Sequence, residues 1–210
     1  MEKFTTLRGV AAPLLRTNID TGAIIAPIYM LSTSIDLGAK LFANWRYDAQ
    51  GGEIPEFVLN QPRYRAARIL LGGPNFGCGS SREGAVWALM RFGIRCVIAP
   101  SFGEIFFSNA CQNGLLPVTL DERQTCRLAD AVIAAPEPVM TVDLVRCTVT
   151  SPQGDEVSFE LAEDRRMSLL EGLDETSLIL RHEHEIDAYQ TRLRTEQPWV
   201  FIGEGDFTRN

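Results

Sequence analysis

The sequence predicts an α/β fold in which parallel strands alternate with helices. Between residues 69 and 120, apolar strand-like runs alternate with amphipathic helical segments in the order strand, helix, strand, helix, strand. Alternation at this spacing indicates right-handed crossovers and parallel pairing. Two later apolar runs, 139–150 and 156–161, flank the turn Ser-Pro-Gln-Gly-Asp, which predicts an antiparallel hairpin.

The first residues predict a strand followed by a polar turn. Residues 4–15 form the strand region, and the turn consists of Asn18, Asp20, Thr21 and Gly22. This turn either is an Asx turn that leads into the next element or lines a site.

An apolar segment and a helix-like segment follow. Residues 27–34 read as an apolar loop or short strand, and the side chains at 29–31 belong either to the core or to the wall of a pocket. Apolar positions in 35–47 have a rough helical spacing, and 57–62 read as a short extended piece.

The stretch 72–87, GGPNFGCGSSREGAVW, concentrates more chemistry than any other part of the chain. It follows a strand at 66–71 and leads into a helix at 83–92 that ends at Gly93. Its glycines allow positive φ and close approach of the backbone to a ligand. Ser80 or Ser81 is placed to cap the helix, because Ser80-x-x-Glu83 matches a capping box.

The remaining elements follow the same signals. The helix at 83–92 is expected to turn Trp87 mostly inward, and Ser101-x-x-Glu104 predicts a second capping box. The expected elements after it are a strand at 95–99, a helix from 101 to 113, a strand at 115–120, and helices at 121–134, 163–171 and 182–193.

Composition limits the classes of function. The 210 residues are 45% hydrophobic, and the net charge of -7 argues against non-specific binding to nucleic acid or to anionic membranes. No apolar run reaches the ~18 residues of a membrane span, and the N-terminus lacks the apolar region of a secretory signal. We therefore expect a cytoplasmic protein with neither a nucleic acid nor a membrane as partner.

Five cysteines, at 78, 96, 111, 126 and 147, contain no C-x-x-C spacing. Neither a zinc ribbon nor a complete iron–sulfur ligand set is therefore expected, and we predict no metal ligands in this chain. Most of these thiols should be buried and reduced. Cys78 is the exception, because a helix N-terminus and Arg82 would lower its pKa.

Several common chemistries do not match the glycine-rich stretch. It follows neither the dinucleotide nor the nucleotide phosphate-loop pattern, and the chain has no G-x-S-x-G elbow. His182 and His184 lie two positions apart on a charged helix, so they point to different faces. What remains is recognition of an anion, preferably a carboxylate, by serines and Arg82 at a helix start.

Six segments resemble the small subunits of isopropylmalate isomerases (3-isopropylmalate dehydratases), which are aconitase-like hydro-lyases. The resemblance covers about residues 4–193. The matching segments are NIDT at 18–21, FVLNQP at 57–62, NFGCGSSRE at 75–83, APSF with IF at 99–106, NGLLP at 113–117 and LLEGLD at 169–174.

The resemblance implies a fold and a partner. The fold would be an aconitase-type swivelling domain over residues 1–197, layered β/β/α with a parallel strand–helix–strand core and an antiparallel hairpin, followed by a tail at 198–210. It would close over a large subunit in a heterodimer. The large subunit, and not this chain, would bind a [4Fe–4S] cluster.

The resemblance also implies a reaction on a small dicarboxylate substrate. The family dehydrates and rehydrates 2-isopropylmalate to 3-isopropylmalate in leucine biosynthesis. By resemblance, Ser80 is the catalytic base, Arg82 binds a substrate carboxylate and Ser81 assists as a hydrogen-bond donor. The substrate-binding residues would be Asp20, Thr21, Tyr29, Met30, Leu31 and Gly79.

Two positions depart from the family pattern. Gly22 stands where the family has aspartate, and Gly84 stands where it has histidine. The loop 28–32, which by resemblance reads the variable group of the substrate, has no Lys or Arg, so an apolar or small group is favoured. The alternatives are a hydratase for citraconate, methylmalate or dimethylmaleate, and a non-catalytic stabilising subunit.

Overall fold

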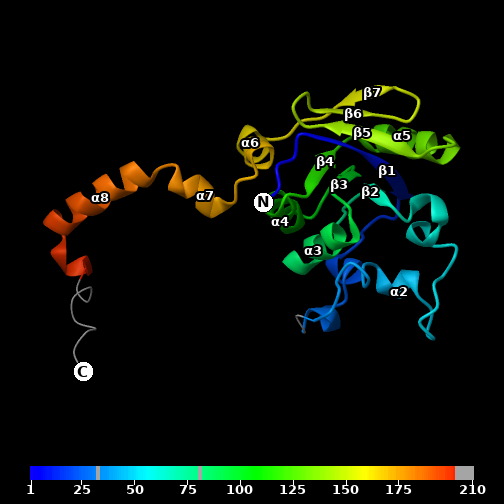
Figure 1. Cartoon of the computed structure of the whole chain (residues 1–210), viewed down its shortest axis with the longest axis horizontal. Helices are drawn as coiled ribbons and strands as arrows, with labels where there is room; N and C mark the ends of the chain where they lie inside the picture. The colour runs from blue at the N-terminus through cyan, green and yellow to red at the C-terminus, as the bar shows by residue number, and fades with distance from the viewer. Residues whose placement is uncertain (32–33, 80–81, 202–210) are drawn as a thin grey trace. The chain divides into compact units, whose positions relative to one another are not determined.

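The computed structural model describes residues 1–31, 34–79 and 82–201 (Figure 1). The chain divides into two compact units, Met1–Gly172 and Leu173–Asn210. The first unit contains the strands and the candidate site. The sequence-based division into one domain over 1–197 and a tail stays a prediction.

The first unit contains a mixed seven-stranded sheet in the order β4-β3-β2-β1-β5-β6-β7. Strands β1 to β4 pair in parallel, and β5, β6 and β7 add in antiparallel fashion beside β1. The bounds are β1 (Thr6–Leu14), β2 (Ala67–Gly72), β3 (Cys96–Ala99), β4 (Leu116–Thr119), β5 (Val139–Asp143), β6 (Thr148–Thr150) and β7 (Glu156–Ser158). This arrangement confirms the α/β fold with its parallel block and antiparallel hairpin.

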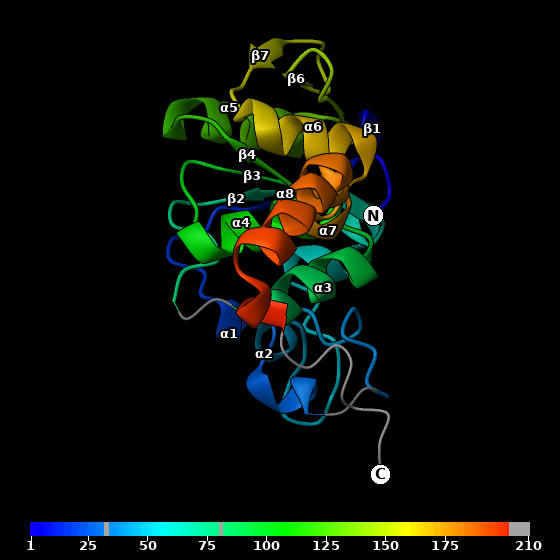
Figure 2. The ribbon, with the colours of Figure 1, turned by 90° about the vertical axis from the view of Figure 1, so that its left-hand side faces the viewer.

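The parallel block is covered by helices on both faces. Figures 1 and 2 place α3 (Glu83–Phe92) and α4 (Glu104–Asn113) below the strands and α5 (Glu122–Ala134) above them. Because both faces are covered, β3 and the residues of β2 from Ile69 to Leu71 are apolar and fully buried, whereas Arg68 in β2 is exposed. A short helix, α6 (Glu163–Glu171), packs against α4.

The residues that end α3 and α4 were easier to predict from local sequence than the residues that cap their starts. Gly93 and Gly114 end α3 and α4 with φ of 115° and 87°, as predicted. The N-cap residues are Arg82 and Gly103, and neither makes a side-chain cap hydrogen bond. The predicted cap at Ser101 is therefore wrong, whereas Ser80 and Ser81 lie outside the described residues. The Ser101 hydroxyl instead accepts a hydrogen bond from the backbone N–H of Asn75 at 2.8 Å.

Trp87 was predicted to face inward and is instead 43% exposed. Its indole Nε1 donates a hydrogen bond to Oδ1 of Asn113 at 2.9 Å, so the ring lies between α3 and α4 at the surface. A polar partner on the neighbouring helix explains why this aromatic residue lies outside the apolar stripe.

Three extended or helical predictions before β2 need correction. Residues 27–30 form a 3₁₀ helix, η1 (Pro27–Met30), and the helix expected over 35–47 is reduced to α2 (Ala43–Arg46). Phe42, with φ of 51°, prevents a longer helix. The segment 57–62 is not extended, since it contains η2 (Val58–Asn60) and leads into η3 (Pro62–Tyr64).

Asn60 explains why the chain curls there. Its buried side chain donates hydrogen bonds to the carbonyls of Arg46 at 2.7 Å and Ile54 at 2.9 Å, and it accepts one from the Arg46 guanidinium at 3.1 Å. These contacts join segments that are distant in sequence, so no local pattern reveals them.

The later part differs from the prediction in two places. The run 139–150 forms two strands, because the Asp143 carboxylate accepts a hydrogen bond from the N–H of Arg146 and Cys147 takes a φ of 53°. The second unit contains α7 (Glu175–Leu180), α8 (Glu183–Glu196) and η4 (Pro198–Phe201), and the sequence predicted only α8. Within the described ranges, no helix has the length and apolarity to cross a membrane.

Candidate active site

The candidate site lies where β1 and β2 end. Since parallel strands present their carboxyl ends at the same edge of a sheet, the loops that follow Leu14 and Gly72 meet there. The Gly77 N–H donates to the carbonyl of Ile19 at 2.7 Å, and the Thr21 N–H donates to that of Cys78 at 3.1 Å. These backbone bonds hold the polar turn and the glycine-rich stretch side by side.

The glycine-rich stretch is also fixed to the loop after β3. Phe76 donates to the carbonyl of Ser101 at 3.0 Å, and Gly103 donates to that of Phe76 at 2.9 Å. The buried ring of Phe76 packs edge-on against Phe102 and Phe106. The stretch therefore rests on an aromatic cluster and is bound on both sides, which gives it a rigid base.

Gly77 and Gly79 have the positive φ that the sequence predicted, at 73° and 86°. A Cβ on Gly77 would overlap the ring of Phe106, so only glycine fits above the aromatic cluster. A Cβ on Gly79 would come no nearer than 3.8 Å to Asp20, so this position is open on the side of the site.

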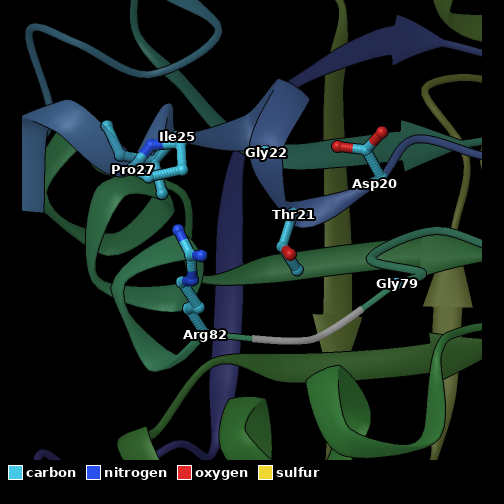
Figure 3. A pocket seen from close by; sticks show the side chains of 7 residues that line it. All are labelled: Asp20, Thr21, Gly22, Ile25, Pro27, Gly79 and Arg82. Atoms are coloured by element: carbon cyan, nitrogen blue, oxygen red, sulfur yellow. The ribbon is translucent and has the colours of Figure 1, made fainter.

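These loops enclose a cavity of about 280 Å³. The described residues that line it are Asp20, Thr21, Gly22, Ile25, Pro27, Gly79 and Arg82 (Figure 3). The cavity therefore brings together the polar turn, the segment that leads into η1 with its first residue, and the start of α3.

Arg82 carries the positive charge of this cavity. Its side chain is exposed and extends from the start of α3 toward Ile25 and Pro27 (Figure 3). With the part of the chain that the structure describes, its guanidinium forms neither a hydrogen bond nor an ion pair. Its donors are thus available for an anionic ligand.

Asp20 and Thr21 shape the opposite side. Asp20 is the N-cap of α1 (Thr21–Ile24), and its Oδ1 accepts a hydrogen bond from the N–H of Ala23 at 2.7 Å. Thr21 is buried, and its side chain points from α1 into the space between α1 and the glycine-rich stretch (Figure 3). The sequence left open whether this turn is an Asx turn or lines a site. In the structure the same residues do both.

The predicted site residues fall into three groups. Asp20, Thr21, Gly79 and Arg82 line the cavity. Ser80 and Ser81 lie outside the described residues.

Tyr29, Met30 and Leu31, on η1 and just after it, are not among the lining residues described. The Tyr29 ring lies 5.4 Å from the Lys40 ammonium, and Leu31 is 81% exposed. The role of these three residues in binding substrate stays a prediction.

Sequence reasoning missed Ile25 and Pro27, which provide the apolar part of the lining. Ile25 lies between the polar turn and η1, and Pro27 begins η1, so their place in the chain next to two predicted site segments was the available signal. Gly22, noted for its departure from the family pattern, also lines the cavity.

Among the residues described, no three Cys, His, Asp or Glu side chains gather so as to hold a metal ion. Cys96 and Cys111 are buried, and burial raises the pKa of both thiols, that of Cys111 to about 11. Cys126 is exposed on α5.

Comparisons with known proteins agree over most of the chain. The family model of the aconitase C-terminal domain matches residues 1–123, and a model described as LeuD_N matches 127–163.

The "3-isopropylmalate dehydratase small subunit" of Rhodospirillum centenum is 51% identical over 201 residues, with 95% of this chain and 99% of the relative covered. That of Paramagnetospirillum magneticum is 49% identical, with 95% and 100% covered. A crystal structure of 3-isopropylmalate dehydratase from Methanocaldococcus jannaschii, 25% identical, matches 88% of this chain and 99% of its own with a TM-score of 0.61.

Proposed function

Because this chain belongs to the family of 3-isopropylmalate dehydratase small subunits, we propose that it forms a hydro-lyase with a large subunit. The enzyme would interconvert 2-isopropylmalate and 3-isopropylmalate in leucine biosynthesis, in the cytoplasm. Beyond family membership, the observation that carries this proposal is the exposed Arg82 guanidinium at a cavity lined by Ile25 and Pro27.

Arg82 would bind one carboxylate of the substrate. A guanidinium presents parallel N–H donors that match the two oxygens of a carboxylate. Since no described residue competes for these donors, binding breaks no ion pair between Arg82 and the described part of the chain. The start of α3 directly after Arg82 adds a favourable dipole for an anion.

Ile25 and Pro27 would accept the apolar substituent of the substrate. Arg82 is the one cation among the described lining residues, and Asp20 contributes a carboxylate. A third substrate carboxylate would therefore lack a charge partner, and its burial would be costly. An isopropyl group needs no such partner, and binding in this pocket would remove its apolar surface from water, which is favourable.

Ser80 would act as the catalytic base. It lies in sequence between Gly79 and Arg82, both of which line the cavity. Removal of a proton by a serine alkoxide needs hydrogen-bond donors and positive charge in a site that excludes water. Arg82 would supply the charge, and Ser81 would donate a hydrogen bond.

The large subunit would complete the site. Because the described residues contain no group that could hold a metal, an iron–sulfur cluster would be held by the partner. The Lewis acidity that assists loss of the substrate hydroxyl would come from that [4Fe–4S] cluster. This chain would contribute the base, the carboxylate-binding arginine and the apolar wall.

The test uses the complex of this chain with its large subunit, reconstituted with iron and sulfide without oxygen. Hydration of isopropylmaleate, citraconate and dimethylmaleate is measured for the wild type and for the Arg82→Ala and Arg91→Ala variants. Arg91 is an exposed arginine near the far end of α3 and serves as the control. We expect isopropylmaleate to be preferred and only Arg82→Ala to lower kcat/KM, by at least ~100-fold.

Preference for citraconate or dimethylmaleate would assign the chain to a related hydratase. Turnover of none of the three by a cluster-loaded complex would favour a non-catalytic stabilising subunit. Equal effects of the two arginine substitutions would remove Arg82 from the site.

A further inference from the structure

Gly84 and Met30 share one space. Gly84 is a buried residue in the first turn of α3, and a Cβ built at position 84 would overlap the Sδ of Met30. The Cγ and Cε of Met30 lie 3.3 and 3.8 Å from that point. No larger residue fits at position 84 while Met30 keeps this position, since cores do not tolerate such overlap.

Met30 is also the last residue of η1, and Pro27, the first residue, lines the cavity. The turn between them is tight, because the Tyr29 N–H donates to the carbonyl of Ala26 at 3.0 Å and the proline ring fixes its own φ. A shift of the Met30 backbone would therefore move η1 and, through Pro27, the apolar wall of the cavity.

We propose that Gly84 is a specificity-determining positioning residue, which seats Met30 against α3 and so sets the distance of the Pro27 wall from the substituent of the substrate. This inference rests on the proposed function. Gly84 touches no substrate and acts only through Met30.

A methyl group at position 84 is expected to push Met30 and the end of η1 away from α3 rather than unfold the chain, because Met30 is only partly buried. The displaced wall would restrict the space for a branched substituent more than that for a methyl group. Since the wall would contact a non-reacting part of the substrate, we expect the substitution at position 84 to change KM more than kcat.

The experiment compares four variants in the complex with the large subunit: Gly84→Ala, Met30→Ala, the double variant and Met167→Ala. Met167 is a methionine of α6, 37% exposed and not among the residues that line the cavity, and it controls for the loss of a methionine. The kcat/KM ratio of isopropylmaleate to citraconate and the thermal midpoint are measured for each.

We expect Gly84→Ala to lower this ratio about tenfold, a size typical of a misplaced methyl group in an apolar pocket. The double variant should restore the ratio to within about twofold of that of Met30→Ala. Alanine normally raises helix stability relative to glycine, so the thermal midpoint of Gly84→Ala should rise only when Met30 is also truncated.

An unchanged ratio in Gly84→Ala, or a double variant that behaves as the sum of its parts, would overturn the inference. If the wild type hydrates neither substrate, the proposed function fails. The thermal midpoints of the variants then test by themselves whether Gly84 and Met30 are coupled. Additive midpoints would overturn the coupling of Gly84 to Met30, whereas non-additive midpoints would support it.

Discussion

The side-chain amide of Asn75 donates a hydrogen bond to the side-chain oxygen of Asn18 at 2.8 Å. The two residues lie in the loops that follow β2 and β1, and they have φ of 59° and 54°. Asparagine tolerates this left-handed conformation better than most residues, and its amide can bond across the gap. The pair thus fixes the two loops that form the cavity.

Two substitutions of Asn75 separate the contribution of its backbone conformation from that of its hydrogen bond to Asn18. Asn75→Ala loses the hydrogen bond and puts alanine, which tolerates the left-handed region less well than asparagine, at a φ of 59°, so we expect a loss of about 2 kcal/mol in the free energy of unfolding. Asn75→Gly loses only the hydrogen bond and should cost less. Urea denaturation measures both, and an equal loss would show that backbone strain contributes nothing.

The buried contact of Gly77 distinguishes it from an exposed glycine of similar conformation. A Cβ on Gly77 would overlap the Phe106 ring, whereas Gly51, with φ of 84°, has nothing within 4 Å of its Cβ position. We expect Gly51→Ala to cost about 1 kcal/mol and Gly77→Ala about 2–4 kcal/mol, since overpacking adds to backbone strain. Urea denaturation at one temperature compares the two, and similar losses would contradict the close packing on Phe106.

Ser80 and Ser81 offer a matched pair for the proposed chemistry. Ser80→Ala should lower kcat of the reconstituted complex by about 10²–10⁴ with little change in KM, because a general base acts on the chemical step. Ser81→Ala should lower it less. Steady-state kinetics with isopropylmaleate provide the measurement, and full activity of Ser80→Ala would remove it as the base.

Thiol reactivity should follow burial. At pH 8 a thiol with a pKa of about 11, as for Cys111, has roughly one thiolate in a thousand molecules. We expect an alkylating reagent to modify the exposed Cys126 first and to reach Cys96 and Cys111 only after unfolding. Mass spectrometry of labelled peptides checks this order, and early labelling of Cys96 in the native protein would contradict its burial.

The sequence predicted the elements whose signals are local. Gly93 and Gly114 mark the ends of α3 and α4, because a left-handed residue after a helix is a property of a few neighbouring positions. The predicted start of α4 was wrong, because Ser101 bonds to the N–H of Asn75 instead of capping the helix. A capping serine and a loop-bridging serine have the same local sequence, and only the contact distinguishes them.

By itself, the sequence determined the family, the parallel arrangement of β2, β3 and β4 and four lining residues, Asp20, Thr21, Gly79 and Arg82. Periodicity and motif residues are local, so they can be read along the chain. The tertiary structure alone decided that Ile25 and Pro27 form the apolar wall and that Met30 fills the space beside Gly84. These contacts join residues of separate elements, and packing between such elements depends on the shape of the assembled core rather than on neighbours in sequence.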